Sequence, residues 1–338
     1  MRARCQCPVT MLHRSGEAFL LDLILLGRGN RAFMSLSGFN RDYAKGVAAV
    51  LLATLFWSLS GLFIRIIPNA DVWQITAWRS ASMSLGLLLF LLAIYGRGTI
   101  ARFRQLDRWA LLGSAGFFAV GSTLYIVSLT LAGTANVACL SNLTPIFAPV
   151  LARIVVGERT GPAIWFAAVL AVLGVFVVFG TDFSQGSALG NALSLVVAFC
   201  FAAQTVWLRR YRDMDLVPAV CLGGIVVFLG VALLRGGLVV SRETLGFILA
   251  MGLIQLALPL ILYTRAARWV PAVQLTLFAL LDVILNPFWT WLVVDEHPSM
   301  NAVWGGMLIL AGVLISVVAV RRPVPVEPAA VVQPVGER

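Results

Sequence analysis

Charged residues are scarce in this chain, and lysine is almost missing. Only 12% of the 338 residues are Asp, Glu, Lys or Arg, against roughly 25% in soluble domains. Lys45 is the only lysine in the sequence. A phosphate-binding P-loop requires Lys directly before Ser or Thr. The sequence therefore excludes an ATP-driven pump that carries such a loop within this chain.

Histidine and cysteine are also too few to suggest a metal centre or a disulfide framework. His13 and His297 both lie outside the apolar stretches, and no His-Glu-x-x-His motif occurs. Of the five cysteines, Cys139, Cys200 and Cys221 fall inside apolar stretches, where a thiol behaves as a small packing residue. We predict no metal site, no disulfide, no cofactor, no catalytic residue and no enzymatic activity.

Long apolar stretches fill most of the sequence, which is 60% hydrophobic. Ten of them approach the roughly 20 residues that a helix needs to cross a bilayer. Stretches such as SMSLGLLLFLLAIY are apolar on every side, unlike the alternating strands of a membrane barrel. The sequence therefore predicts an all-α polytopic membrane protein. Its ten predicted spans are residues 46–66, 73–95, 109–130, 135–157, 162–180, 189–208, 217–239, 245–267, 272–294 and 301–320.

The distribution of arginine predicts the orientation, because Lys and Arg in short loops stay on the cytoplasmic side. If the first span starts on that side, the opposite face keeps little more than Arg65, Arg235 and Arg242. Both termini are therefore predicted to be cytoplasmic, in a multi-pass protein of the cell (inner) membrane. The net charge of +10 comes mostly from these cytoplasmic arginines. We interpret it as a sign of orientation and of contact with anionic membrane lipid, not of nucleic-acid binding.

The two ends of the chain are predicted to lie outside the helical core. Residues 1–45 contain the run AFLLDLILL, which is too short to span a bilayer. This extension is expected to be either disordered or the product of a mis-assigned start, with Met34 as the true first residue. Residues 321–338 are rich in proline and are expected to form a disordered tail.

The sequence contains an internal repeat. A shift of 138 positions lays LYIVSLTLAGTANVACLSNLTPIFAPVLARIVVGE over LYTRAARWVPAVQLTLFALLDVILNPFWTWLVVDE without a gap. The matched pairs include Tyr125 with Tyr263, Pro149 with Pro287 and Glu158 with Glu296, and at another offset Arg65 matches Arg209. We predict two copies of a five-helix unit, residues 46–180 and 189–320.

An odd number of spans per copy predicts that the second copy is inverted relative to the first. The loop around Glu158 carries arginines, whereas the matching loop VDEHPS around Glu296 has no Lys or Arg. Inverted repeats are typical of secondary transporters, whose binding site lies near the midplane between the two halves. The repeat therefore predicts a transporter.

The repeated segments resemble a known family. LTPIFAPVLARIVVGER followed by AVLAVLGVFVV, and the first span LLATLFWSLSGLFIRI, are similar to segments of the EamA family of the drug/metabolite transporter superfamily. WQITAWRS with Arg79 is similar to its arginine-bearing segment. The resemblance covers roughly residues 46 to 320. It implies a secondary transporter of a small organic solute such as a metabolite, an amino acid or a drug, moved mostly outward, without identifying the solute.

Three prolines are predicted to bend the fourth and ninth spans. Pro149 and Pro287 occupy matching positions, which indicates a bend common to both halves. Pro145 is present only in the first half, because the matching position in the second half is Val283. Pro145 is therefore expected to shape one side of the site.

Two ionisable residues inside the predicted spans are the main candidates for a binding or coupling site. Asp282 lies near the middle of span 272–294, where a charge costs roughly 2.5 to 3.5 kcal/mol. Either it binds a coupling proton or a cationic group, or it is a structural acid hydrogen-bonded to Asn286. Arg79 either binds a substrate carboxylate, or extends to the lipid headgroups or pairs with an acid of the bundle.

Neutral polar and aromatic residues form a second group of candidates. Pro145 frees the backbone carbonyl of Ser141 next to Asn142, which would form a polar corner for a substrate. Trp57 could line a pocket, and Gln204 also falls inside a span. The alternative for the amides is that they join neighbouring helices.

Glu158 and Arg159 are expected at the cytoplasmic rim, with Glu296 as their counterpart on the other face. An acid at a helix end beside arginines is typical of a lock between loops, and a gating role is the alternative. For the whole chain, the second candidate function is a non-transporting scaffold or sensor with a transporter fold.

Overall fold

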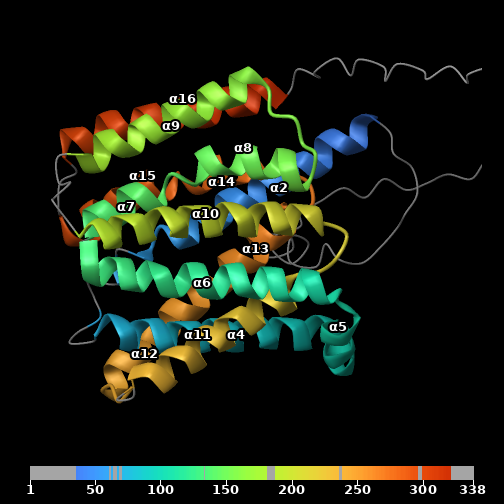
Figure 1. Ribbon diagram of the computed structural model, residues 1–338, viewed down its shortest axis with the longest axis vertical. Helices are drawn as coiled ribbons and strands as arrows, with labels where there is room; N and C mark the ends of the chain where they lie inside the picture. The colour runs from blue at the N-terminus through green and yellow to red at the C-terminus, as the bar shows by residue number, and fades with distance from the viewer. Residues whose placement is uncertain are drawn as a thin grey trace, which may run out of the picture.

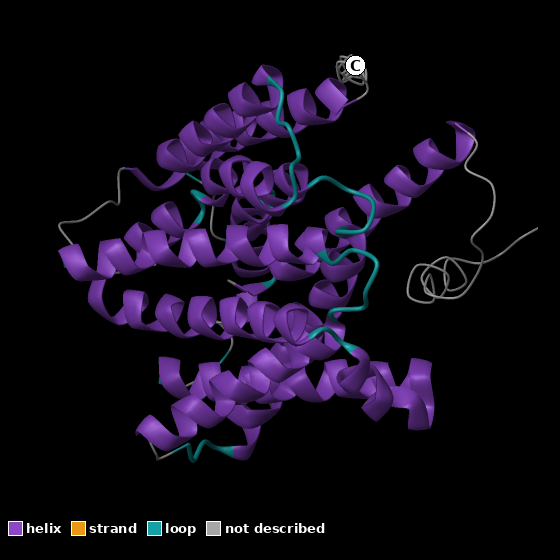
Figure 2. Ribbon diagram, turned by 45° about the vertical axis from the view of Figure 1, so that its right-hand side comes forward, coloured by secondary structure: helices purple, strands orange, loops and turns teal. Residues whose placement is uncertain are grey.

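The computed structural model describes residues 36–60, 62–63, 67, 71–132, 134–180, 187–235, 238–295 and 299–320. Within these ranges every regular element is a helix and no strand occurs (Figures 1 and 2). The predicted all-α class is therefore confirmed. Met34, Glu296 and the predicted tail 321–338 lie outside the described residues, as does the predicted extension before residue 36.

The helices follow one another along the chain with short connections. Those before residue 181 are α2 (Leu36–Trp57), α4 (Val72–Tyr95), α5 (Thr99–Gln105), α6 (Arg108–Ala132), α7 (Thr134–Ser141), α8 (Thr144–Val155) and α9 (Pro162–Phe179). Those after residue 186 are α10 (Ala188–Arg210), α11 (Val217–Arg235), α12 (Arg242–Ala250), α13 (Leu258–Ala266), α14 (Ala272–Ala279), α15 (Asp282–Val294) and α16 (Met300–Val320).

Nine helical stretches within the described ranges are long and apolar enough to cross a membrane. They correspond to the second to tenth predicted spans. The first predicted span differs, because α2 begins at Leu36, before the predicted start at residue 46, and its described part ends at Trp57. Residues 64–66, at the end of that predicted span, lie outside the described residues.

The short helix α5 was not predicted. It follows a 3-10 turn at Gly96–Gly98 and carries Arg102 and Arg104 in its last turn. The guanidinium of Arg102 lies 4.6 Å from the centre of the Tyr95 ring, and the Tyr95 hydroxyl donates a 2.7 Å hydrogen bond to Asp215. These contacts join the end of α4 to the segment that precedes α11.

The helices pack as pairs of long neighbours. α9 lies along α16, α6 along α10, α4 along α11 and α2 along α13 (Figure 1). Small residues such as Ala167, Ala168 and Ala171 are fully buried, whereas Leu173 on the same helix is 52% exposed. Hydrocarbon gives no hydrophobic drive between helices, so close packing of small residues holds such a bundle together.

Glycines bring the backbones of α9 and α16 together. A Cβ atom on Gly174 would lie 2.6 Å from the carbonyl oxygen of Gly305, and one on Gly305 would meet the carbonyl oxygen of Gly174. A Cβ atom on Gly312 would lie 2.7 Å from the carbonyl oxygen of Ala167. Side chains larger than hydrogen at these positions would force the two helices apart.

The fourth and ninth predicted spans are each broken in two, at matching positions. α7 and α8 are separated at residues 142–143, and α14 and α15 at residues 280–281, which is the 138-residue offset of the sequence repeat. At each break the backbone turns more tightly than in an α-helix, because its hydrogen bonds join residues three apart. The N–H of Leu143 donates to the carbonyl of Leu140, and the N–H of Leu281 donates to the carbonyl of Phe278. The second break occurs without a counterpart of Pro145, so this proline alone does not create it.

The C-terminal ends of the two half-helices also match. Gly157 has a φ of 75° and Asp295 a φ of 58°, again at the 138-residue offset. Glycine adopts this left-handed conformation freely, and aspartate is among the residues that tolerate it. The change from Gly157 to Asp295 therefore preserves the turn. Pro149 and Pro287 lie inside α8 and α15, between the break and this turn.

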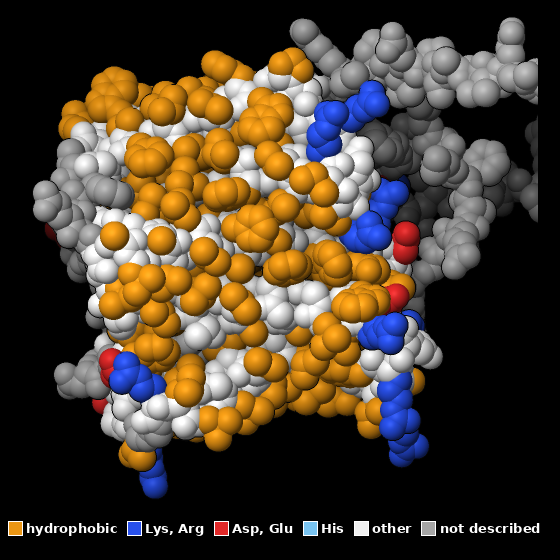
Figure 3. Space-filling model, viewed as in Figure 1, with side chains coloured by type: hydrophobic (Ala, Val, Ile, Leu, Met, Phe, Trp, Pro, Cys, Tyr) orange, Lys and Arg blue, Asp and Glu red, His pale blue; other side chains and the backbone are white. Residues whose placement is uncertain are grey.

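Basic side chains gather mainly at one end of the bundle (Figure 3). A smaller basic group lies at the opposite end, where α11 finishes at Arg235 and α12 begins at Arg242. Between the two ends the surface is mostly hydrophobic (Figure 3), as a helix bundle surrounded by lipid requires.

We predict that Gly174→Ala destabilises the protein by about 1–3 kcal/mol, because the added methyl group collides with the backbone of α16. The measurement is unfolding in mixed detergent micelles followed by tryptophan fluorescence. Gly230→Ala on α11 is the matched control, since a Cβ atom there meets nothing within 4 Å. Equal stability of the two variants would contradict close packing of α9 on α16.

Candidate functional site

A pocket of about 790 Å³ lies where the two broken helices meet. The first break contributes Asn142 and Thr144, and the second contributes Leu280 and Asp282. Helices α2, α4, α6 and α10 supply further walls. Interrupted helices around a central cavity are a common way to place polar groups within a membrane protein.

The structure brings most of the candidate binding residues to this one pocket. Those that line it are Asp282, Arg79, Asn142, Trp57 and Asn286, together with Pro287. Gln204 is not among the lining residues. It is buried between α10 and α6, where its Nε2 atom donates a 2.8 Å hydrogen bond to the hydroxyl of Ser114. This contact gives Gln204 a role in helix packing.

The pocket contains a guanidinium and a carboxylate that do not pair with each other. The Nε atom of Arg79 and the Oδ1 atom of Asp282 are both shielded from solvent and have no hydrogen-bond partner among the described residues. No ion pair joins these two side chains in that part of the chain. The phenol of Tyr125 lines the same pocket.

Tyr125 was not predicted as a site residue. The sequence signal was its match with Tyr263 in the repeat. The two tyrosines have different surroundings, because Tyr263 is buried and its hydroxyl lies 2.9 Å from that of Thr205. Tyr125 lies near the end of the predicted span 109–130 and carries no charge, so it did not stand out beside Asp282 and Arg79.

The asparagines of the pocket form specific hydrogen bonds. The Nδ2 atom of Asn142 donates to the carbonyl oxygen of Ala138 at 2.8 Å, and the carbonyl of Ser141 accepts from the Thr144 hydroxyl at 3.0 Å. The backbone acceptor that was expected beside Pro145 is therefore already bonded. Asn286 donates to the hydroxyl of Ser60 at 3.2 Å.

One wall of the pocket is aromatic. The Trp57 ring lies 5.0 Å from that of Tyr263 and 6.1 Å from that of Phe201, and both Trp57 and Phe201 line the pocket. The carbonyl of Trp57 accepts a 3.2 Å hydrogen bond from Gln255. Gln255 lies in a π-helical turn at Met251–Ala257, a distortion that is frequent at functional sites.

The pocket reaches one end of the bundle. Its lining includes Thr134 at the start of α7, Phe179 at the end of α9 and Ser299 just before α16. The chain enters α7 at this end and leaves α8 at the other. The pocket therefore extends away from Glu158, which follows α8.

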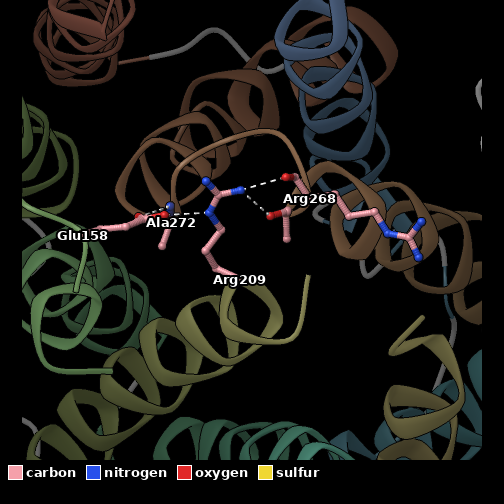
Figure 4. A network of polar contacts seen from close by, with 5 residues as sticks. Glu158, Arg209, Arg268 and Ala272 are labelled. Atoms are coloured by element: carbon pink, nitrogen blue, oxygen red, sulfur yellow. Dashed lines mark hydrogen bonds and ion pairs between the residues drawn. The ribbon is translucent and has the colours of Figure 1, made fainter. Parts of the chain in front are cut away.

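A network of polar contacts surrounds Glu158 at the other end (Figure 4). Its Oε1 atom accepts a 2.7 Å bond from Nε of Arg209, and its Oε2 atom accepts a 3.4 Å bond from the backbone N–H of Ala272. Arg209 also donates to the carbonyls of Ala267, at 3.1 Å, and Arg268, at 2.8 Å. The network thus joins α8 to the ends of α10 and α13 and the start of α14.

Arg209, not the neighbouring Arg159, is the ion-pair partner of Glu158. Arg159 is exposed, and its side chain forms no hydrogen bond or ion pair with the described residues. No partner for Glu158 was predicted from the sequence, and the match of Arg65 with Arg209 in the repeat was the available signal for Arg209. Arg210 also takes part, because its guanidinium donates to the carbonyl of Val155 at 2.7 Å.

A family model described as the EamA-like transporter family matches this chain twice, at residues 44–180 and at residues 188–318. The chain belongs to the EamA-like transporter family. The resemblance found in the repeated segments is thus confirmed. Membership makes this a multi-pass membrane protein of a transporter family rather than of an enzyme family.

Two other proteins and a solved structure resemble this chain over most of its length. An uncharacterized transporter, YdfC of Bacillus subtilis, is 26% identical over 71% of this chain and 79% of its own length. The pseudopaline exporter CntI of Pseudomonas aeruginosa is 22% identical over 78% of this chain and 93% of its own length. A crystal structure superimposes with a TM-score of 0.73 at 17% identity, covering 82% of this chain and 98% of the other.

We predict that Arg209→Gln destabilises this EamA-like chain more than Glu158→Gln does, with a loss of about 1–3 kcal/mol for the arginine variant. Arg209 bonds to two backbone carbonyls as well as to Glu158, and both carbonyls lose that donor in the variant. Unfolding in mixed micelles measures the difference.

Arg153→Gln is the control, because Arg153 is exposed on α8. Arg209→Lys tests the geometry of the network, since a lysine cannot supply the guanidinium fork. Full stability of Arg209→Lys would show that charge alone, and not the fork, holds this end together.

Proposed function

We propose that this protein is a secondary transporter that exports a small organic solute across the cell (inner) membrane by alternating access. The observation that carries the proposal is a pocket with charged groups that extends to one end of the bundle, while a polar network closes the other end. A binding site that is accessible from one side at a time is the physical requirement for coupled transport.

The proposed architecture is ten membrane-spanning helices arranged as two inverted five-helix repeats, with α2 belonging to the first span. Its support is the double match of the family model and the breaks at equivalent positions in α7–α8 and α14–α15. The packing also supports it. α4 with α11 and α9 with α16 are pairs of equivalent spans, and α2 with α13 mirrors α10 with α6.

The proposed orientation places both termini in the cytoplasm. Its support is the arginine-rich end of the bundle (Figure 3), because basic loops are retained on the cytoplasmic side. In this orientation the network around Glu158 closes the cytoplasmic side and the pocket extends outward. The described conformation is then an outward-facing state.

Asp282 is the proposed coupling residue, with a proton as the coupling ion. It is the first residue of α15 and lies inside the ninth predicted span. It also lines the pocket, so its proton can exchange with water when the pocket is open. Export would then be driven by protons that bind on the outer side and leave on the inner side.

The activity test uses the purified full-length chain in proteoliposomes. Solutes that accumulate in cells lacking the gene, as identified by metabolite profiling, are loaded into the vesicles and their efflux is measured. Efflux above that of protein-free vesicles is expected for at least one of them. If none of the panel moves, the scaffold or sensor interpretation is favoured over transport.

We predict that acidifying the outer side accelerates export by the unchanged protein, because a proton on Asp282 releases a bound cationic group outward. Asp282→Asn cannot bind this proton, so its residual efflux should not depend on the pH gradient. Asp213→Asn, at an exposed position, is the control and should retain the dependence. An unchanged pH dependence in Asp282→Asn would refute proton coupling through this residue.

We also predict that opening the cytoplasmic network shifts the protein away from the outward-facing state. In a background without the five native cysteines, Ala138→Cys in the pocket should react with a membrane-impermeant maleimide added outside. Adding Arg209→Gln should lower that rate at least threefold, which corresponds to a shift of about 0.7 kcal/mol between the two states.

Val239→Cys, which replaces an 88% exposed residue, reports on general reactivity and should be unaffected. If the rate at Ala138→Cys stays the same while the network is broken, the network does not control access to the pocket.

A further inference from the structure

We propose that the arginine-rich end of the bundle holds a second binding site, for the phosphate group of an anionic phospholipid. Three arginines form it, namely Arg102 on α5, Arg265 in the last turn of α13 and Arg268 just after that helix. None of them lines the pocket where the broken helices meet. The site is carried by the guanidinium of Arg265, which is buried without a partner, and it does not depend on the transport of any solute.

Arg265 is buried but unpaired. Only 4% of its surface is exposed, and its Nε and Nη1 atoms are shielded from solvent and have no hydrogen-bond partner among the described residues. Its Nη2 atom is not among the shielded atoms, so the guanidinium stays accessible along that edge. The guanidinium lies 4.8 Å from the centre of the Phe90 ring, a contact that stabilises a cation but satisfies no N–H group. Arg265 therefore has hydrogen-bond donors to offer to an anion.

The acid that precedes α11 is already engaged by other groups. Asp215 accepts a 2.7 Å hydrogen bond from the hydroxyl of Tyr95 and a 3.2 Å bond from the backbone N–H of Val217. It forms no ion pair with an arginine in the part of the chain that the structure describes. Its carboxylate therefore does not neutralise Arg265 by direct contact.

The aromatic rings of α4 bring Arg102 to the same place as Arg265. The guanidinium of Arg102 lies 4.6 Å from the centre of the Tyr95 ring, whereas Arg265 lies over Phe90, five residues earlier on the same helix. Both rings pack against one buried apolar cluster that α4, α11 and α13 share. The two arginines thus approach the end of α4 from different segments of the chain.

Arg268 completes the group from the other side of Asp215. Its Nη2 atom donates a 3.4 Å hydrogen bond to the carbonyl of Met214, the residue before Asp215. Figure 4 shows its side chain extending away from Arg209 and the network around Glu158. Three positive charges therefore gather around one carboxylate, which leaves an excess of two positive charges to attract an anion.

Phosphate is the anion that this chemistry fits best. The planar guanidinium fork matches the oxygens of a phosphate group and binds them bidentately. A charge near the end of a membrane span is costly unless it is paired or reaches the headgroups. Basic pockets between membrane helices on the cytoplasmic side commonly bind the headgroups of anionic lipids.

The surroundings of α5 favour a phospholipid over a soluble phosphate compound. This helix lies at the arginine-rich end of the bundle (Figures 1 and 3). Ile100 on α5 is 69% exposed, and Trp109 at the start of α6 is 60% exposed. Apolar side chains exposed beside arginines suit the boundary between acyl chains and headgroups. They offer contacts to acyl chains, which a soluble compound lacks.

The test follows thermal unfolding of the full-length protein in micelles of a neutral detergent, measured by tryptophan fluorescence. Phosphatidylglycerol and phosphatidylcholine with identical acyl chains are added separately. A ligand that binds only the folded protein raises its unfolding temperature. Phosphatidylglycerol should raise the midpoint by about 2–4 °C more than phosphatidylcholine, because only its headgroup carries a net negative charge.

Two variants assign this difference to the proposed site. Arg265→Gln and Arg102→Gln should each lose at least half of the difference between the two lipids. Arg153→Gln, at an exposed position on α8, removes the same charge elsewhere and should keep the difference. Without lipid, the midpoint of Arg265→Gln should not fall, because the substitution removes a buried charge that has no partner. A purely structural Arg265 would instead lower the midpoint equally in all micelles.

Asp215→Asn gives a change of the opposite sign. The asparagine oxygen can still accept the hydrogen bond from Tyr95, but the negative charge beside the arginines is lost. The difference between phosphatidylglycerol and phosphatidylcholine should therefore stay the same or increase. A smaller difference in this variant would contradict an anion site.

Soluble glycerol 3-phosphate separates the two sources of a phosphate group. At the concentration at which phosphatidylglycerol is used, it should leave the midpoint unchanged. An equal shift by glycerol 3-phosphate would show that the site takes a soluble phosphate compound, and the assignment to lipid would be wrong. Equal stabilisation by the two lipids, or an equal loss in Arg153→Gln, would overturn the site itself. These outcomes leave the efflux assay, and the function it tests, unaffected.

Discussion

The cost of an unpaired charge in the membrane interior is the constraint on which the rest of this structure depends. The protein handles it in two opposite ways, in the polar network around Glu158 and in the pocket. At one end, Arg209 is fully engaged by Glu158 and two backbone carbonyls, which ties α8 to the later helices. In the pocket, Arg79 and Asp282 keep shielded atoms without partners among the described residues. The first arrangement stabilises one conformation, and the second leaves binding energy available to a ligand.

The repeat conserves the backbone and varies the side chains. The helix breaks, the proline inside each following half-helix, and the left-handed residue that ends it recur at one offset, although Val283 replaces Pro145 and Asp295 replaces Gly157. Similar backbone geometry thus survives where the residue expected to cause it has changed. By contrast, Thr144 and Asp282 occupy equivalent positions with different charge. In the proposed transporter, this difference in charge would supply an asymmetry for recognising a polar solute between two similar backbones.

The sequence predicted the membrane spans well, because one physical effect dominates their formation. Burial of apolar helices in lipid predicted the second to tenth spans, since each needs a nearly fixed length. It failed where local backbone geometry decides. The breaks at residues 142–143 and 280–281 and the π-helical turn around Gln255 lie inside predicted apolar spans, so hydropathy does not mark them. The helix α5 was missed because its sequence TIARFRQ, with two arginines, is as polar as a loop. The partner of Glu158 was missed for a different reason. Glu158 pairs with Arg209, which lies more than 50 residues away in the sequence. The adjacent Arg159 looks equally suitable from the sequence alone.

The half-helix α8 connects the pocket to the polar network around Glu158. It begins at Thr144 in the pocket wall and ends at Val155, three residues before Glu158. Twelve residues of helix span about 18 Å at 1.5 Å per residue, so one helix runs from the pocket to the polar network. In the proposed mechanism, a change at the pocket end would displace Glu158 relative to Arg209. α15 has the same construction, with Asp282 at its start and the left-handed Asp295 at its end. In the proposed mechanism, binding at the breaks would act on both half-helices at once, which is the simplest physical route from an occupied pocket to a change in which end of the bundle is closed.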